Sequence, residues 1–221
     1  MPAPINMIKD NLKEQLIIGA QNLEIKLTDV QTEQLLTYLQ LLLKWNKIYN
    51  LTNINNPEDV LSLHLLDCLA VTPIITAYIK NTEVKILDIG SGAGLPGVII
   101  SIIYPDIDIL CIDSSARKIS FIQQVSQILS LNHLHTEHQR VEKISGSFNI
   151  ITSRAFSSLN KFTSLTDHLL TPEGVWLAMK GKIPQQEIDE LTKGVDVFHV
   201  EQVHLPNLDV QRCVVMMRKN H

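Results

Sequence analysis

The chain has few cysteines, and none is arranged for a metal centre or a disulfide framework. Cys68, Cys111 and Cys213 are the three cysteines among 221 residues. They are odd in number, lie far apart and form no C-x-x-C pair, which argues against a zinc site and against a disulfide-rich secreted scaffold. We therefore expect reduced thiols, a cytoplasmic protein and no bound metal.

The sequence also lacks long apolar runs. Stretches such as Val98–Tyr104 are far shorter than the roughly 18–20 residues that cross a bilayer. The first residues, MPAPINMIKDNLKEQL, do not combine a charged leader with an apolar core as a secretion signal does. These absences predict no membrane span and no secretion signal.

An excess of positive charge is missing too. The 19 Lys and Arg residues are outnumbered by 23 Asp and Glu residues, so the formal net charge is −4. Any binding to nucleic acid must then rely on a local basic patch or on a preassembled partner. With 45% hydrophobic and 19% charged residues, the composition is that of a packed globular protein, which we expect to be a monomer.

The N-terminal third of the chain shows helical patterns. Thr28–Gln31 has the S/T-x-x-E/Q form of a capping box, and the leucines that follow it recur at helical spacing. Asn56 and Pro57 mark a second start, with an N-cap residue followed by proline at the first helical position. We expect residues 1–70 to form a helical cap that is integral to the protein and packs on residues 71–221.

From about residue 84 the pattern changes to strands that alternate with helices. The short β-prone runs are 84–89, 107–112, 148–152 and 175–179. Such alternation predicts an α/β, Rossmann-like fold with a mostly parallel sheet covered by helices. Two consecutive strand-like segments, 195–205 and 211–218, are joined by the turn-prone Pro206–Asp209 and predict a C-terminal antiparallel hairpin at one edge of the sheet.

The most informative segment is the glycine-rich turn after the first of these strands. Gly92–Gly97 satisfies G-x-G-x-x-G and Asp113 follows 21 residues after Gly92, a spacing that permits a dinucleotide site. Two features oppose a pyrophosphate, because Asp88 adds negative charge and Pro96 removes an amide donor. A cationic ligand without phosphates suits both features. S-adenosylmethionine is such a ligand, and the Asp113 carboxylate can accept hydrogen bonds from its two ribose hydroxyls.

The arrangement Asp88-x-Gly90-x-Gly92-x-Gly94 resembles the first motif of the class I methyltransferases, which are Rossmann-like and use S-adenosylmethionine. Asp113 then looks like the acid that binds the ribose in such enzymes. The same residues could instead form only a tight turn followed by a solvated acid. The agreement of a first acid, three glycines and a second acid favours the cofactor site.

Further segments extend the resemblance to essentially the whole chain. They occur in one order: Lys44–Asn46, Tyr49–Thr52, His64–Asp67, Asp88–Gly97, Gln139–Glu142, Ser153–Phe156 and Lys180–Gly181. Together they resemble the bacterial small-subunit ribosomal RNA guanine-N7 methyltransferases, also called the glucose-inhibited division protein B family. The resemblance implies methyl transfer from S-adenosylmethionine to N7 of a guanine in 16S ribosomal RNA, position 527 of that RNA. The partner implied is this RNA within a small-subunit particle, with neither a metal nor a membrane.

The resemblance also suggests roles for individual residues. Gly90 and Leu95 would lie against the cofactor, and Val141 and Glu142 would end the third strand and hold the adenine. Arg154 would bind the methionine carboxylate through two parallel hydrogen bonds. A plain surface charge for Glu142 and an ion pair at the sheet edge for Arg154 stay open as alternatives. Basic candidates for contacting RNA phosphates are Arg117, Lys118, Lys180 and Arg212.

No residue is assigned as a general base. Guanine N7 has a free lone pair and no proton to remove, so its methylation requires alignment rather than proton transfer. Ser153–Phe156 also differs from the Asn/Asp-Pro-Pro-Tyr/Phe signature of enzymes that methylate exocyclic amines. His64 and Asp67 are three residues apart on a predicted helix, and we expect them to be a structural pair that docks the N-terminal helices onto the sheet.

Two other functions stay open. A small-molecule methyltransferase would suit the negative net charge. A non-catalytic accessory protein that binds S-adenosylmethionine or RNA would suit the fold, but the intact glycine loop with Asp88 and Asp113 disfavours it.

Overall fold

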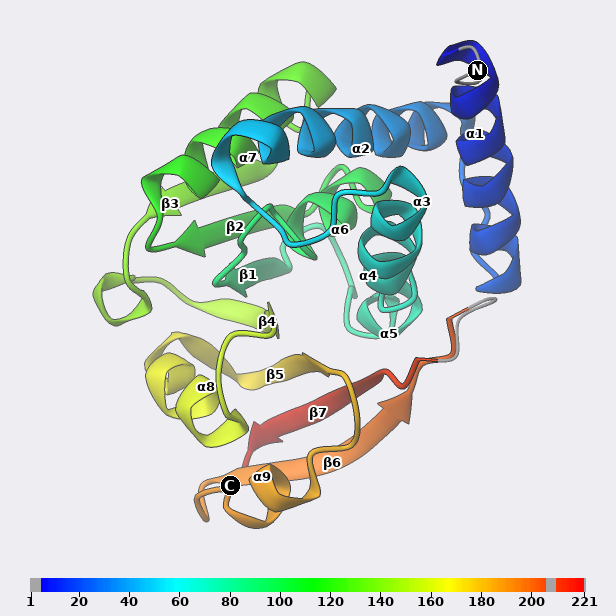
Figure 1. Cartoon of the computed structure of the whole chain (residues 1–221). Helices are drawn as coiled ribbons and strands as arrows, with labels where there is room; N and C mark the ends of the chain where they lie inside the picture. Colours follow the sequence, from blue (N-terminus) through cyan, green and yellow to red (C-terminus); the bar gives the residue numbers. More distant parts are fainter. Residues whose placement is uncertain (1–4, 206–209, 221) are drawn as a thin grey trace.

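A seven-stranded sheet crosses the molecule in the order β3-β2-β1-β4-β5-β7-β6 (Figure 1). It is seen in a computed structural model that describes residues 5–205 and 210–220. The strands, in chain order, are β1 (Lys85–Ile89), β2 (Asp108–Asp113), β3 (Leu134–His138), β4 (Phe148–Arg154), β5 (Leu170–Lys180), β6 (Val195–Gln202) and β7 (Cys213–Lys219).

The directions of the strands confirm the predicted fold. Strands β1 to β5 are paired in parallel, and β7 is antiparallel to both β5 and β6. The C-terminal hairpin therefore extends the sheet beyond β5, with β7 inside and β6 at the edge. The turn predicted at Pro206–Asp209 lies outside the described residues.

One strand differs from the sequence expectation. β3 has the polar sequence LHTEH and lies at the edge of the sheet, where most of its side chains are exposed, so it has no apolar run that would mark it. The expectation that Val141 and Glu142 end the third strand is wrong. β3 ends at His138, and Val141–Lys143 form the 3₁₀ helix η2, in which the backbone amide of Lys143 donates to the carbonyl of Arg140.

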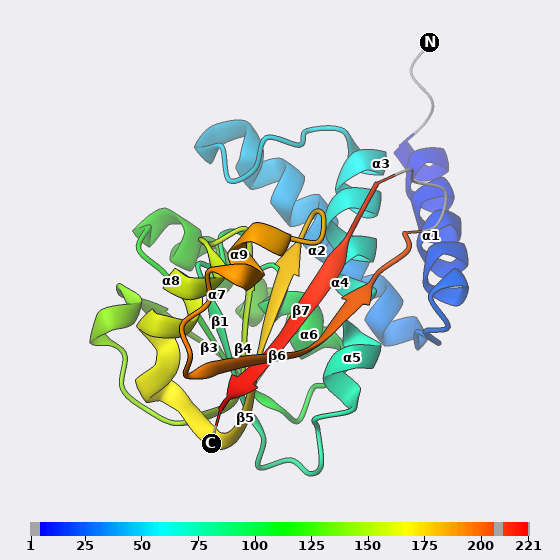
Figure 2. The same ribbon diagram turned by 90° about the horizontal axis from the view of Figure 1, so that it is seen from below.

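Helices cover both faces of the sheet. Alternate strand residues belong to two separate apolar clusters, with Ile86 in one and Leu87 in the other. Figure 2 shows α8 on one side and α1, α3 and α4 on the other. The helices are α1 (Ile5–Asn22), α2 (Asp29–Tyr49), α3 (Pro57–Val60), the π-helix η1 (Leu61–Leu66), α4 (Asp67–Leu69), α5 (Thr72–Thr76), α6 (Gly97–Ile103), α7 (Ala116–Leu129), α8 (Leu159–Thr166), the 3₁₀ helix η3 (Asp167–Leu169) and α9 (Gln185–Asp189).

Helix α2 begins where the sequence predicts. The Thr28 hydroxyl accepts from the Gln31 amide at 3.2 Å, and the Gln31 side chain accepts from the Thr28 amide at 3.0 Å, which completes the capping box. The helix buries its leucine face in the same cluster as α6 and α7. The Tyr38 hydroxyl donates to the Ala93 carbonyl at 2.8 Å, so α2 also contacts the glycine loop.

The second predicted start opens a longer helical run, Pro57–Thr76. The Asn56 side chain caps it by accepting from the Glu58 amide at 2.8 Å. The run is long and apolar enough to cross a membrane, with a mean hydropathy of 1.5, but 67% of it is buried inside the protein, as in the core helix of a globular domain. The expected boundary at residue 70 falls within this run.

Candidate functional site

A cavity of about 350 Å³ opens at the carboxyl ends of β1, β2 and β4. In a parallel sheet, ligands bind where neighbouring strands lead the chain to opposite sides, and β1 lies at that point between β2 and β4. Five of the residues singled out in the sequence line the cavity: Gly90, Asp113, Lys118, Val141 and Glu142.

The glycine loop forms one wall of the cavity. Gly90 has a φ of +63°, which favours glycine, and a Cβ there would lie 2.6 Å from the Phe156 ring. Phe156 lines the same cavity. The loop and the segment after β4 therefore approach each other too closely for any side chain at residue 90.

Asp113 reaches the cavity from the end of β2 with both carboxylate oxygens held. Its Oδ2 accepts from the Gly92 amide at 3.0 Å, and its Oδ1 accepts from the Ser115 amide at 2.8 Å. Lys118 Nζ lies 3.7 Å from Oδ2. Each oxygen keeps a second lone pair, so the carboxylate can still accept hydrogen bonds from a ligand's hydroxyls.

Asp88 lies beneath the glycine loop rather than along the cavity. It is completely buried, and its Oδ2 accepts from the Gly97 amide at 2.9 Å. Burial raises the pKa of the Asp88 carboxyl to about 7, although the Gly97 amide and Arg154 act in the opposite direction. Its Oδ1 has no hydrogen-bond partner among the described residues. Negative charge at this position is costly unless a positive group compensates for it.

Three other loop residues predicted to bind the cofactor do not line the cavity. Leu95 is buried in the apolar core, and Gly94 packs against Val98 and Ile122. Gly92 contributes through its amide, which donates to Asp113. These residues support the shape of the loop.

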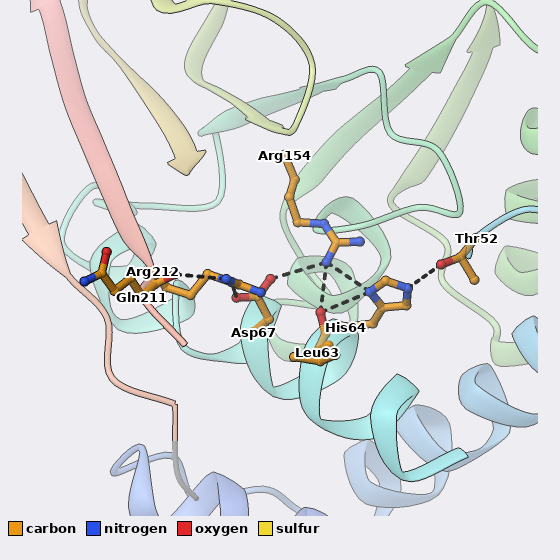
Figure 3. Close-up of polar contacts among 7 residues, drawn as sticks. All are labelled: Thr52, Leu63, His64, Asp67, Arg154, Gln211 and Arg212. Atoms are coloured by element: carbon orange, nitrogen blue, oxygen red, sulfur yellow. Dashed lines mark hydrogen bonds and ion pairs between the residues drawn. The ribbon is translucent and has the colours of Figure 1, made fainter. Parts of the chain in front are cut away.

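Arg154, at the end of β4, lies in a polar cluster beside the cavity (Figure 3). Its Nη1 donates to the Leu63 carbonyl and to Asp67 Oδ2, both at 3.3 Å, and lies 3.2 Å from His64 Nδ1. The other Asp67 oxygen accepts from Arg212 Nε at 2.8 Å. One buried carboxylate thus lies between two guanidinium groups, which leaves the cluster with net positive charge.

His64 contributes no charge to this cluster at neutral pH. Burial, together with the nearby charge of Arg154, lowers the pKa of the His64 ring to about 4. Its Nε2 lies 2.8 Å from the Thr52 hydroxyl, so the ring connects the segment after α2 to the end of β4. His64 does not line the cavity.

The four candidates for RNA contact are dispersed. Lys118 lies in the cavity beside Asp113, and Lys180 donates to the Glu187 carboxylate at 2.7 Å and to the Ser157 carbonyl at 2.9 Å. Arg212 is held by Asp67. Arg117 is exposed on α7 and has no ion pair with the described residues.

Sequence reasoning missed several lining residues. Gln139, Arg140, Ala155 and Phe156 lie within segments that carried the family resemblance, so those segments contained a usable signal. Lys161, on α8, lines the cavity as well, and no local pattern marks it. In residues 5–205 and 210–220, no three His, Cys, Asp or Glu side chains gather closely enough to hold a metal ion.

Comparison with known proteins identifies the family of the chain. The GidB family model, described as rRNA small subunit methyltransferase G, matches residues 31–215. A protein from Methylibium petroleiphilum named ribosomal RNA small subunit methyltransferase G is 46% identical over 209 residues, covering 94% of this chain and 95% of that protein. A protein of the same name from Leptothrix cholodnii is 47% identical over 207 residues, covering 93% of this chain and 95% of that protein.

Solved structures agree at the level of fold. TrmN from Thermus thermophilus superposes with a TM-score of 0.57 at 12% identity, covering 72% of this chain and 53% of that one. The ribosomal protein L11 methylase from Lactobacillus delbrueckii subsp. bulgaricus gives 0.53 at 13% identity, covering 76% and 81%. Since the family model and the relatives cover most of the sequence, the chain belongs to the GidB family, the rRNA small subunit methyltransferase G family.

Proposed function

We propose that this chain transfers the methyl group of S-adenosylmethionine to N7 of a guanine in 16S ribosomal RNA. The observation that carries the proposal is the cavity at the ends of β1, β2 and β4, with the Asp113 carboxylate directed into it. Family membership supports RNA of the small subunit as the substrate.

The residues present suit S-adenosylmethionine. Asp113 offers free lone pairs to the two ribose hydroxyls, and Val141 and Glu142 line the part of the cavity proposed for the adenine. The buried Asp88, with one oxygen unpaired, lies under the loop, where a cationic ligand nearby would stabilise its charged form. When bound, S-adenosylmethionine supplies a methyl group on a positively charged sulfur, an electrophile that needs no further activation.

Arg154 is proposed to bind the methionine carboxylate. Its hydrogen bonds with the described residues all involve Nη1, as the dashed lines in Figure 3 show, and its Nε and Nη2 donate to no described residue. These two nitrogens form one edge of the guanidinium and match a carboxylate bidentately. Asp67 would then keep the side chain oriented from the other edge.

The acceptor requires no general base. Guanine N7 has no proton to remove, so the ionisable side chains that line the cavity, among them Glu142 and Lys161, need no part in proton transfer. The chain contributes by aligning the two reactants. We further propose a cytoplasmic monomer that acts on a small-subunit particle, because a net charge of −4 does not favour binding to naked RNA.

The proposal predicts a rate that is nearly independent of pH. Single-turnover methyl transfer to small-subunit particles at saturating cofactor should change little between about pH 6.5 and 8.5, because no proton is transferred. The cofactor must be saturating because the rate then reports only the cofactor-bound enzyme. Titration of Asp88 in the enzyme without cofactor does not affect it. The His64→Ala variant should keep this flat profile, whereas Arg154→Ala should lower the rate or the cofactor affinity at every pH.

Two results would contradict the proposal. A slope near one in the logarithm of the rate that disappears in His64→Ala would demonstrate a catalytic base. Mapping of the methyl group to an exocyclic amine would exclude N7. Labelling of a small molecule instead of RNA would favour the alternative of a small-molecule methyltransferase.

A further inference from the structure

A second cavity, of about 480 Å³, lies on the same edge of the sheet as the first. It is bordered by the end of β6 and the residues before β7, and by the segment that follows β5. The strand register aligns them, because Cys213 at the start of β7 pairs with Lys180 at the end of β5 and with Gln202 at the end of β6. The two cavities therefore lie along the same carboxyl edge, the first beside the end of β4 and the second beside the end of the neighbouring strand β5.

The lining of the second cavity suits an anion. It contains Lys182, His204 and Arg212, together with the side-chain amides of Gln202 and Gln211, and no Asp or Glu is among the described residues that line it. Lys182 and His204 are exposed, and neither has a hydrogen bond or ion pair with any described residue. Within the described part of the chain these donors are therefore unpaired, in a protein whose overall charge is negative.

The two cavities are connected through Asp67. Its carboxylate holds Arg212, which lines the second cavity, and Arg154, which precedes the cavity-lining Ala155 of the first (Figure 3). Asp67 is 4% exposed, so this connection is shielded from solvent. A ligand held by Arg212 would therefore have a fixed position relative to Arg154 and to the reacting methyl group.

We infer that the second cavity binds the phosphodiester backbone of the substrate RNA beside the acceptor guanine, with Lys182 and His204 donating to phosphate oxygens. The inference rests on the proposed function, since it assigns a place to the RNA of that reaction. RNA carries regularly spaced anions together with base edges that accept and donate hydrogen bonds. A basic cavity with two amide side chains matches both.

The test uses Lys182→Ala in the full chain, with Lys193→Ala as the matched control. Lys193 is also an exposed lysine without a side-chain partner among the described residues, but it precedes β6 at the opposite end of that strand. Methylation of small-subunit particles and binding of naked 16S RNA are measured against RNA and salt concentration, and S-adenosylmethionine affinity is measured by calorimetry.

Lys182→Ala should raise the half-saturating RNA concentration about tenfold both in methylation of particles and in binding of naked RNA. It should also reduce the slope of log affinity against log salt by roughly 0.7–0.9, the value of one lost phosphate contact. Cofactor affinity and all Lys193→Ala values should equal those of the unmodified chain. A structural defect would not change the salt slope by this amount.

Other results would overturn the inference. An unchanged RNA dependence and salt slope in Lys182→Ala would remove the cavity from the RNA path while leaving the proposed function intact. A loss confined to particles would indicate contact with a ribosomal protein instead. If the unmodified chain binds S-adenosylmethionine but does not methylate small-subunit particles, the proposed function itself fails.

Discussion

At the residue scale, Asp113 joins the glycine loop to the start of α7. Its two oxygens accept from the Gly92 and Ser115 amides and face the cavity between them. Replacing it with alanine should remove charge-assisted hydrogen bonds to the cofactor worth roughly 1.5–3 kcal/mol, or about one to two decades in affinity. Calorimetric titration of folded Asp113→Ala checks this, and an unchanged Kd would exclude Asp113 from the site.

His64 makes stability depend on pH. Its pKa is lowered from 6.5 to about 4 on folding, so between these values the unfolded chain binds a proton that the folded chain does not. Its contribution to stability is therefore complete above pH 6.5 and is lost as the pH falls toward 4. We expect the free energy of unfolding of the unmodified chain minus that of His64→Asn to rise between pH 4.5 and 6.5, by on the order of 2–3 kcal/mol.

The free energy of unfolding of the unmodified chain is compared with that of His64→Asn because Asp88 changes stability with pH in the opposite direction. Its pKa is raised to about 7 on folding, so the folded chain binds the extra proton and stability falls as pH rises toward 7. Asp88 contributes equally in both proteins and cancels. Urea unfolding at several pH values gives the measurement, and a difference that stays constant with pH would show that the folded state does not depress the pKa of His64.

The sequence predicted where Asp113 lies in the site, but it did not predict the contacts of Arg154. Asp113 is positioned by residues at fixed short spacings in a strand, turn and helix, so a local pattern marks it. The contacts of Arg154 depend on Asp67, which lies 87 residues away, and through it on Arg212. No local pattern encodes an ion pair between segments so far apart, and only the folded sheet brings them together.

At the element scale, the packing of α6 on the sheet depends on the absence of a side chain at Gly97. A Cβ there would meet Cys111 Sγ and would lie 2.9 Å from Asp88 Oδ2. Gly97→Ala should therefore destabilise the protein by about 1–3 kcal/mol, even though alanine is the better helix former. Gly194→Ala is the control, because a Cβ at Gly194 has no neighbour within 4 Å. Equal denaturation midpoints for the two variants would contradict this account.

The elements that the sequence predicted well are those whose burial follows a simple period. β1, β2 and β4 are buried strands with apolar runs, and α2 has a capping box at its start. The sequence did not predict the π-helix η1, because its leucines recur at the spacing of an ordinary α-helix and π-helical turns are rare. β3 escaped prediction because an exposed edge strand needs few apolar residues.

At the scale of the whole molecule, residues 1–70 are predicted to be an integral cap. Leu35, Leu39 and Leu42 share one apolar cluster with the helices on the sheet, and the Tyr38 hydroxyl binds the glycine loop. A chain that begins at Ile74 should expose this apolar surface and aggregate, and the full chain should unfold in a single calorimetric transition. Two separate transitions, or a shortened chain that is monomeric and fully active, would contradict the prediction.

The position of β7 has a consequence for how the protein is made. Synthesis proceeds from the N-terminus, yet the strand that follows all others in the chain occupies an interior place in the sheet, between β5 and β6. Until residues 213–219 emerge, β5 presents an open edge and β6 has no neighbour to pair with. Arg212, beside Asp67 and the second cavity, arrives just before that strand. A nascent chain would therefore complete the proposed RNA-binding edge only after residues 213–219 have paired with β5 and closed the sheet.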